Sequence, residues 1–227
     1  MQKNSIKKNL KLLTGLAICF CLLSSGSTKR SKAMLSIVIS TKKPENLKRV
    51  LKSIEQTAIL KNQLIIYENP RGRGLCVVYN ECAVKAFNGL LCFVHDDMVF
   101  HTKGWDQIIV NLLQQETVGL VGVIGGRYKS LFGTSWRDGE TTSYRMQVKD
   151  GVEGGKLLVN NPSNKKYDEV VCLDGAFLAC TKKHWQQFPF DENRFNDFHF
   201  YDLDISLQMH TAGATGRRSQ VACTFYR

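Results

Sequence analysis

In the first half of the chain, continuous runs of apolar residues alternate with segments in which apolar residues recur at helical spacing. Continuous runs rich in Val, Ile and Leu have the length of buried strands. These predicted strands cover residues 35–41, 63–67, 90–94 and 118–123. Between them, apolar residues recur at the spacing of an amphipathic helix. The predicted helices cover residues 44–54, 75–87 and 104–115. Pro44 suits the first turn of the first helix, and the predicted order is β-α-β-α-β-α-β.

This alternation predicts an α/β fold, in which helices cover both faces of a mainly parallel central sheet. In such sheets, ligands bind beyond the carboxyl ends of the strands. Thr41, Glu68 and the pair Asp96-Asp97 all fall at such ends. We therefore expect these side chains to lie around one cleft.

The apolar run 90–94 stops abruptly at His95-Asp96-Asp97. Burial of unpaired charge is costly, so these side chains are expected at the mouth of a cleft. A carboxylate in this position suits a hard divalent cation such as Mg²⁺ or Mn²⁺. Such a cation can neutralise a diphosphate leaving group.

Residues 125–167 break the alternation, because they are rich in Gly, Ser, Thr, Asn and Lys. We expect an elaborated, partly mobile loop beside the site, since the segment is long for a structureless connection. Its aromatic residues would either stack on a ligand or anchor a surface excursion; they are Tyr128, Phe132, Trp136 and Tyr144. The elements expected after it are strands at 170–175, 176–180 and 219–226, a short helix capped by Thr181, and a helix that carries Leu203 and Leu207.

A second acidic cluster, Asp202-Leu203-Asp204, lies at the expected start of that last helix. A carboxylate there could take a proton from an incoming hydroxyl group. Two residues that are two positions apart on a helix point in different directions. Only one of the two carboxylates is therefore expected to face the cleft, and the other to cap the helix or pair with a basic neighbour.

Together these motifs resemble a known family. The motifs of the first half lie at residues 35–41, 68–69, 74–80 and 93–97, and those of the second half at 173–175, 190–192 and 198–204. Their order and spacing resemble a family 2 (GT-A) glycosyltransferase, in the small bacterial subgroup with His-x-Asp and Phe-His-Phe-Tyr-Asp signatures. The resemblance covers nearly the whole chain from Met34 to Tyr226.

The resemblance implies roles for the residues at the strand ends. Asp97 would bind the metal ion, and His95 would bind the metal or a phosphate. Asp96 would lie near the donor sugar or the ribose. The remaining donor-binding positions implied by the resemblance are Thr41, Glu68 and Asn80.

The resemblance also implies a catalytic base in the second half. The family's Glu-Asp pair falls on Tyr201-Asp202, so that the glutamate is replaced and Asp202 matches the base. Asp174 matches an acidic position on the acceptor side. His199 and Asp204 are expected to contact the acceptor or to orient the residues that do.

The reaction implied by the resemblance is the transfer of a sugar, with inversion, from a nucleotide-sugar to a hydroxyl group on a glycan or lipid-linked acceptor. A UDP-sugar is the favoured donor, with Mn²⁺ or Mg²⁺ as cofactor. A relative that binds nucleotide or sugar without catalysis is one alternative. A nucleotidyltransferase is another, although the first strand is followed by Lys42-Lys43-Pro44 instead of a Gly-rich phosphate loop.

Residues 1–33 differ in character from the rest. They hold seven basic residues and no acidic one, so residues 34–227 carry only +4 of the total net charge of +11. This mild charge, without a basic stripe interleaved with aromatic residues, argues against nucleic acid as a partner. We expect one domain over residues 34–227, with a nucleotide-binding half at 34–124 and an acceptor and catalytic half at 125–227.

The N-terminal leader, residues 1–33, and the cysteines favour different cellular compartments. A basic stretch followed by apolar residues 12–23 resembles a secretory signal or a short membrane anchor, although a bilayer span needs about 20 residues. Alternatively, translation starts at Met34. The eight cysteines are scattered without a C-x-x-C pair, which is typical of buried thiols in a reducing compartment. A cytoplasmic protein that associates with a membrane through residues 10–27 would satisfy both.

Overall fold

The computed structural model describes residues 35–130, 135–136, 144–149, 157–162, 164–214 and 220–224. The predicted leader, residues 1–33, lies outside the described residues, as does the membrane segment expected at 10–27. None of the helices in the described ranges is both long enough and apolar enough to span a membrane.

The alternation predicted for the first half is confirmed. The elements in chain order are β1 (Leu35–Thr41), α1 (Pro44–Thr57), β2 (Gln63–Glu68), α2 (Leu75–Lys85), β3 (Leu90–His95), α3 (Trp105–Leu113) and β4 (Val118–Gly122). Pro44 stands in the first turn of α1, where its missing N–H group leaves no intrahelical bond unmade.

The second half supplies the remaining elements. They are β5 (Ile124–Gly126), β6 (Tyr144–Lys149), β7 (Leu157–Asn160), β8 (Tyr167–Val170), β9 (Cys172–Leu173), β10 (Phe177–Thr181), α4 (Lys182–Gln187), α5 (Tyr201–Ala214) and β11 (Gln220–Thr224). The predicted cap is confirmed, because the Thr181 side chain accepts a hydrogen bond from the His184 N–H group at the start of α4.

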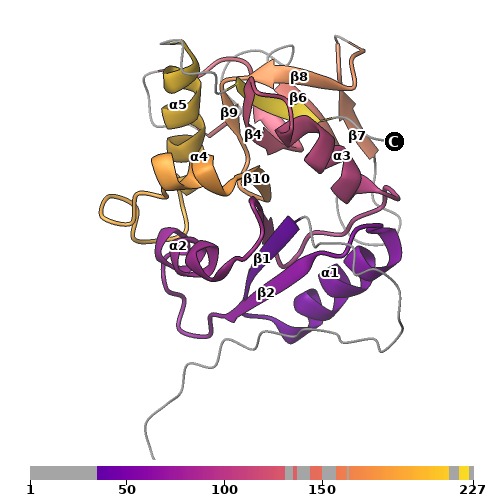
Figure 1. Ribbon diagram of the computed structural model, residues 1–227, viewed down its shortest axis with the longest axis vertical. Helices are drawn as coiled ribbons and strands as arrows, with labels where there is room; N and C mark the ends of the chain where they lie inside the picture. Colours follow the sequence, from indigo (N-terminus) through magenta and orange to yellow (C-terminus); the bar gives the residue numbers. More distant parts are fainter. Residues whose placement is uncertain are drawn as a thin grey trace, which may run out of the picture.

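A seven-stranded sheet runs through the middle of the molecule in the order β2-β1-β3-β10-β4-β11-β8 (Figure 1). The pairs β1–β2, β1–β3 and β4–β11 are parallel. Strand β10 lies between β3 and β4 and is antiparallel to both. The predicted α/β class is confirmed, and β10 brings a strand of the second half into the centre of the sheet, next to His95.

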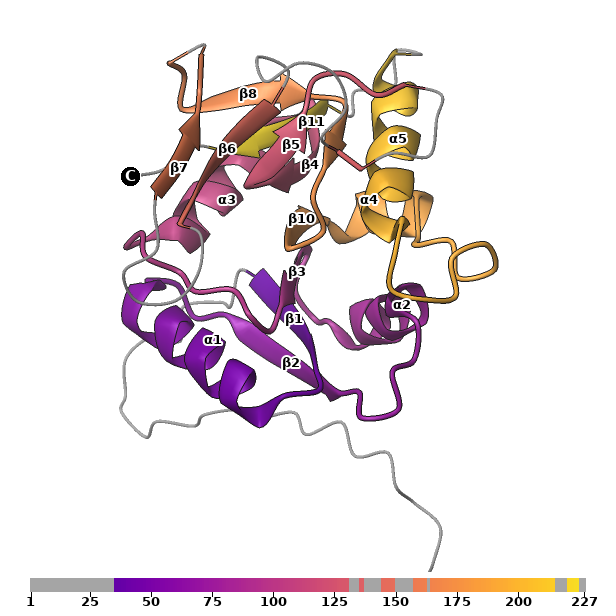
Figure 2. The same ribbon diagram turned by 180° about the vertical axis from the view of Figure 1, so that it is seen from behind.

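The expected loop at 125–167 is wrong where the structure describes it. Strands β5, β6, β7 and β9 form a second, four-stranded sheet in the order β7-β6-β5-β9, of which β7, β6 and β5 are labelled in Figure 2. Trp136 is buried rather than presented to a ligand, and Tyr128 is exposed. Phe132 lies outside the described residues. These strands gave little signal in the sequence because β5, β7 and β9 are only two to four residues long and β6 is rich in polar residues.

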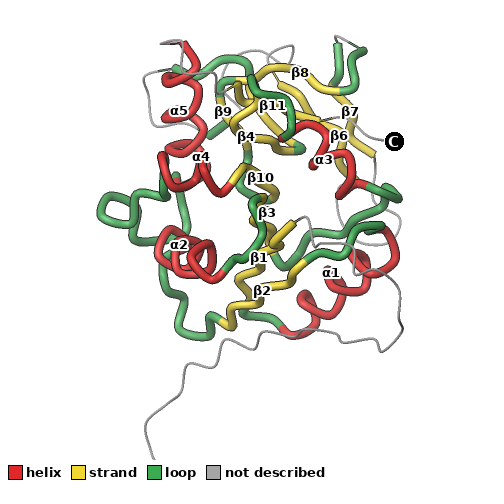
Figure 3. Tube along the Cα trace, viewed as in Figure 1, coloured by secondary structure: helices red, strands yellow, loops and turns green. Residues whose placement is uncertain are grey.

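Helices cover both faces of the main sheet, as predicted (Figure 3). Alternate strand residues point to opposite faces, so that Val38 and Phe93 pack under α2, α4 and α5 while Ile37 and Cys92 pack under α1 and α3. The described cysteines at 76, 82, 92, 172 and 180 are buried thiols, in agreement with the sequence-based expectation.

Candidate active site

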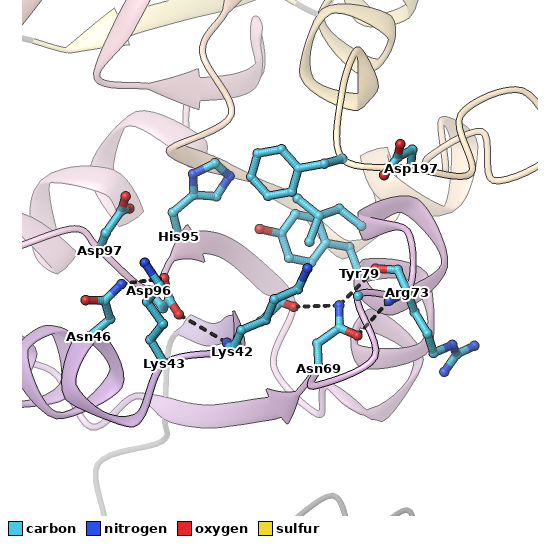
Figure 4. Close-up of a pocket in the computed structure, with 14 residues that line it drawn as sticks. Lys42, Lys43, Asn46, Asn69, Arg73, Tyr79, His95, Asp96, Asp97 and Asp197 are labelled. Atoms are coloured by element: carbon cyan, nitrogen blue, oxygen red, sulfur yellow. Dashed lines mark hydrogen bonds between the residues drawn. The ribbon is translucent and has the colours of Figure 1, made fainter.

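The carboxyl ends of β1, β2 and β3 meet at one edge of the main sheet. In register, Thr41 is opposite Glu68, and Ser40 is opposite His95. Beside this edge lies an open cleft of about 340 Å³. Its lining, drawn in Figure 4, is Ser40, Lys42, Lys43, Asn46, Asn69, Gly72, Arg73, Leu75, Tyr79, His95, Asp96, Asp97, Asp197 and Phe198. The strand ends therefore surround one cleft, but neither the buried Thr41 nor the exposed Glu68 is part of its lining.

Asp96 is held by three groups from the β1–α1 segment. Its Oδ2 accepts a hydrogen bond from Thr41 Oγ1 at 2.6 Å and from the Lys42 N–H group at 3.3 Å. Its Oδ1 accepts one from Asn46 Nδ2 at 3.3 Å. These bonds fix the carboxylate at the cleft wall and join the end of β3 to the end of β1.

Unlike Asp96, Asp97 has no hydrogen-bond partner among the described residues. It is exposed, lines the cleft, and makes no hydrogen bond or ion pair with other described residues. A carboxylate without protein partners keeps both oxygens available for a cation or for solvent.

His95 meets the N-terminus of α5 although the two are far apart in sequence. Its Nε2 lies 2.6 Å from the Tyr201 hydroxyl oxygen. That hydroxyl also donates to the Gly175 carbonyl oxygen at 3.0 Å. Burial lowers the pKa of His95 and so favours the neutral imidazole, although the carboxylates of Asp97, Asp174 and Asp96 oppose this shift.

Asp202 lies next to this contact and is half-buried. Its Oδ2 accepts a hydrogen bond from the Gly175 N–H group, and its Oδ1 accepts one from the Leu203 N–H group, both at 2.9 Å. Burial raises the pKa of the Asp202 carboxyl, which the two N–H donors oppose and the charge of Asp174 reinforces. A carboxylate with a raised pKa binds a proton more readily and is a better base.

Asp174 belongs to the turn that joins β9 of the second sheet to β10 of the main sheet. One carboxylate oxygen accepts a hydrogen bond from the Ala176 N–H group, and the other accepts one from the Trp136 indole. Asp174 and Asp202 thus flank Gly175, outside the residues that line the cleft.

Three predicted site residues, Asp204, His199 and Asn80, lie outside the residues that line the cleft. Asp204 points away from Asp202 and accepts a hydrogen bond from Gln208 Nε2 at 2.6 Å, as expected for two carboxylates two positions apart. His199 is exposed, and its ring forms edge-to-face contacts with those of its neighbours Phe198 and Phe200.

Asn80 lies outside the residues that line the cleft, and its side chain is hydrogen-bonded within the protein. Its Oδ1 accepts hydrogen bonds from the Trp185 indole and from the Phe190 N–H group, and its Nδ2 donates to the Phe190 carbonyl oxygen. These contacts occupy the amide group. They attach the segment before α5 to α2.

Among the cleft residues that were not predicted from the sequence, Lys42 and Asn69 directly follow strands β1 and β2. Lys42 extends through the cleft (Figure 4), and a Cβ atom on Gly72 would lie 2.8 Å from its Nζ. Asn69 closes the turn after β2 through two hydrogen bonds with the Arg73 backbone. Phe198 adds an aromatic ring from the second half, 5.5 Å from the His95 ring between centroids. For Lys42 and Asn69, the position directly after a strand was the signal that could have identified them as cleft residues.

The acidic residues fit a metal ion only in part. Within the part of the chain that the structure describes, no three His, Cys, Asp or Glu side chains converge on a point that could hold a metal. Mg²⁺ commonly binds through one or two carboxylates together with substrate phosphates and water. The cleft therefore fits an ion that Asp97 shares with a bound diphosphate, and it does not fit an ion held by side chains alone.

Solved structures share this fold at low sequence identity. The GalNAc-T7 structure with UDP, GalNAc and Mn²⁺ matches with a TM-score of 0.55 and 11% identity, over 86% of this chain and 43% of that chain. TarS of S. aureus matches with a TM-score of 0.48 and 10% identity, over 86% of this chain and 35% of that one. This chain thus spans less than half the length of either, and the first likeness shows the GT-A fold.

Sequence comparison gives the family. No curated protein sequence matches the chain. A model of the glycosyltransferase-like family matches residues 33–217, which include β1 to β10, the cleft and α5. The resemblance inferred from the motifs is confirmed, and the chain belongs to the glycosyltransferase-like family.

Proposed function

We propose that this protein transfers a glycosyl group, with inversion, from a nucleotide-sugar to a hydroxyl group of a glycan or lipid-linked acceptor. The observation that carries the proposal is the hydrogen-bonded path from the cleft to a candidate base. His95 at the end of β3 contacts Tyr201, Tyr201 contacts the Gly175 carbonyl, and the Gly175 N–H group contacts Asp202. A binding cleft and a half-buried carboxylate of raised pKa are thereby joined.

The cleft is assigned to the donor nucleotide. Lys42 and Lys43 bring positive charge to it, which suits a diphosphate, whereas the guanidinium of Arg73 is paired with Glu81. Asp96, fixed by Thr41 and Asn46, offers carboxylate oxygens to the hydroxyls of a ribose or sugar. A UDP-sugar is the favoured donor, because the structural relative GalNAc-T7 was crystallised with UDP.

A divalent ion, Mn²⁺ or Mg²⁺, is assigned to Asp97. Its carboxylate lines the cleft two residues beyond the end of β3 and, like that of Asp197, has no hydrogen-bond or ion-pair partner among the described residues. The bound ion would supply positive charge that stabilises the departing diphosphate.

Asp202 is assigned as the base. The acceptor oxygen forms a bond to the anomeric carbon of the donor sugar while the bond from that carbon to the diphosphate oxygen breaks. The bonding electrons leave with the nucleoside diphosphate, and the acceptor proton passes to a carboxylate oxygen of Asp202. A single displacement of this kind inverts the anomeric configuration.

Nucleotide release tests the proposal. The full chain is incubated with UDP- and GDP-sugars, Mn²⁺ and a panel of glycan and lipid-linked acceptors, and the free nucleoside diphosphate and the product configuration are measured. Metal-dependent release with an inverted product supports the proposal. Binding of the nucleotide-sugars without turnover under any of these conditions would instead identify a binding protein, and release of pyrophosphate would identify a nucleotidyltransferase.

The rate of transfer is expected to rise with pH through the raised pKa of Asp202. The base must be ionised to accept a proton, so activity is lost as pH falls through that pKa, which burial places above the ordinary carboxyl value of 3.8. The measurement is kcat as a function of pH at saturating donor. An acid limb with its midpoint at or below 3.8 would contradict the assignment.

Replacement of Asp97 by asparagine is expected to weaken metal-dependent binding of UDP by about tenfold or more, since a neutral amide is a poorer ligand for a hard cation. Titration calorimetry with UDP, in the presence and absence of Mn²⁺, measures this change. The matched control is Glu55→Gln, which removes a carboxylate from the exposed face of α1. Equal loss in both variants, or an unchanged affinity in Asp97→Asn, would count against an ion at Asp97.

A further inference from the structure

Two large apolar side chains are exposed at the end of α2. Val84 in the last turn is 68% exposed, and Phe87, two residues beyond the end of the helix, is 64% exposed. Among the described residues, these are the two most exposed large apolar side chains. Single exposed apolar residues are common on soluble proteins, but these two stand only three positions apart.

Lysines surround this apolar pair. Lys85 follows Val84 directly and is exposed, as is Lys183 at the start of α4. The Lys182 Nζ group donates to the carbonyl oxygens of Val84 and Ala86, at 3.4 and 2.5 Å. These bonds attach α4 to the end of α2, on the same side of the main sheet (Figures 1 and 2). The basic apolar patch, as we name this surface, consists of Val84, Lys85, Phe87, Lys182 and Lys183.

No acidic side chain from these segments offsets the charge of the patch. Residues 82–90 and 177–190, which meet there, contain three lysines and no Asp or Glu. The acidic residue that precedes them in α2, Glu81, is paired with Arg73. Interacting surfaces have complementary potentials, so the basic apolar patch suits an anionic partner.

The basic apolar patch lies at the amino ends of the central strands. The Phe87 N–H group donates to the side chain of Gln63, the first residue of β2, at 3.1 Å. The Asn88 side chain donates to the carbonyl oxygen of Leu35, the first residue of β1, at 3.0 Å. The cleft lies at the carboxyl ends of the same strands, so a partner on the patch does not cover the cleft.

The point at which the chain enters β1 favours a lipid surface over an acidic protein. Leu35 is held beside the patch, and residues 1–33 carry seven basic and no acidic residues together with the apolar run 12–23. Residues 24–34 join that run to Leu35, and a chain of this length reaches about 40 Å at most. A leader inserted in a bilayer therefore keeps the patch close to the same bilayer, where lysines attract anionic headgroups.

We propose that the basic apolar patch binds the surface of an anionic lipid bilayer. Val84 and Phe87 enter the boundary between headgroups and acyl chains, and the lysines lie against anionic headgroups. Binding of this kind increases with the apolar area buried in lipid and with the electrostatic attraction. The proposal does not depend on the transferase function, because it concerns the opposite edge of the sheet.

The first test is binding of the full chain to vesicles of phosphatidylcholine, alone or mixed with phosphatidylglycerol, measured by co-sedimentation. The wild type is expected to bind the mixed vesicles more tightly, with an affinity that falls as salt is added. Phe87→Ser should lower the partition coefficient about tenfold, because less apolar area enters the lipid. Lys85→Gln and Lys183→Gln should each lower it about fivefold on the mixed vesicles only.

Matched controls remove similar side chains elsewhere. Val159→Ser replaces an apolar residue that is 56% exposed in β7 of the second sheet, and Lys52→Gln replaces an exposed lysine of α1. Both controls should bind like the wild type. Failure of the wild type to bind either kind of vesicle, or equal losses in the patch variants and the controls, would overturn the proposal.

The second test locates the contact, because residues 1–33 offer a separate route to the membrane. Hydroxyl radicals oxidise exposed side chains, and mass spectrometry of the full chain measures the oxidation of Phe87 with and without mixed vesicles. Oxidation of Phe87 is expected to fall, while that of Tyr128, which is 53% exposed, should not change. Vesicle binding with unchanged oxidation of Phe87 would assign the binding to the leader and refute the patch. Protection of Phe87 without vesicles, increasing with protein concentration, would assign the patch to a second copy of the chain and equally refute the proposal.

Discussion

Replacement of Asp202 by asparagine is expected to lower kcat by about 10²- to 10⁴-fold, the usual contribution of a positioned general base. The amide has almost the same shape as the carboxylate but cannot accept the acceptor proton. Because Asp202 lies outside the residues that line the cleft, KM for the donor should change little. Steady-state kinetics with saturating acceptor measures the two constants separately.

A control on the same helix separates chemistry from structure. Asp204→Asn makes the same change two residues along α5, on a side chain that bonds Gln208 instead of Gly175. It should retain wild-type kcat. Turnover that survives in Asp202→Asn, or an equal loss in Asp204→Asn, would remove Asp202 from the role of base.

The Asp202 variant is not expected to unfold. Because burial raises the pKa of this carboxyl in the folded protein, ionised Asp202 destabilises the fold above that pKa, and the cost disappears as pH falls toward the value in the unfolded chain. Asparagine removes this cost but turns an amide toward one of two N–H donors. The two effects oppose each other, so that melting near pH 7 should stay close to that of the wild type.

Local sequence patterns predicted the first half of the fold well. Strands β1 to β4 are short apolar runs, and the helices between them have one apolar face each, so that the signal for every element lies within its own residues. The end of β3 was equally readable, because His95, Asp96 and Asp97 interrupt an apolar run where charge cannot be buried cheaply. Both inferences rest only on residues that are close to one another in the sequence.

What the sequence could not predict depends on contacts between distant residues. Nothing in the run at 177–181 indicates that β10 lies antiparallel between β3 and β4. Asn80 stands in a motif that implied donor binding, yet its amide holds Trp185 and Phe190. The contact between His95 and Tyr201 spans 106 positions, and only the folded chain makes it visible.

The buried ion pair of Arg145 and Asp168 is expected to dominate the stability of the second sheet. Arg145 Nε in β6 lies 2.6 Å from Asp168 Oδ2 in β8, and the side chains are 2% and 10% exposed. The pair joins the second sheet to the edge strand of the main sheet. Removal of one partner leaves the other charge buried, which typically costs about 3–5 kcal/mol.

Asp168→Asn should therefore lower the melting temperature by about 6–20 °C, if the cost of about 3–5 kcal/mol is converted at about 2–4 °C per kcal/mol for a chain of this size. The matched control is Glu81→Gln, which breaks the exposed pair with Arg73 at the same 2.6 Å separation but at 40% and 44% exposure. Exposed pairs contribute about 0–1 kcal/mol, so this variant should melt within about 4 °C of the wild type by the same conversion. Thermal unfolding followed by circular dichroism measures both. Equal shifts in the two variants would show that burial does not set the cost, whereas a double variant Arg145→Met/Asp168→Leu should recover much of the lost stability, because it removes both buried charges.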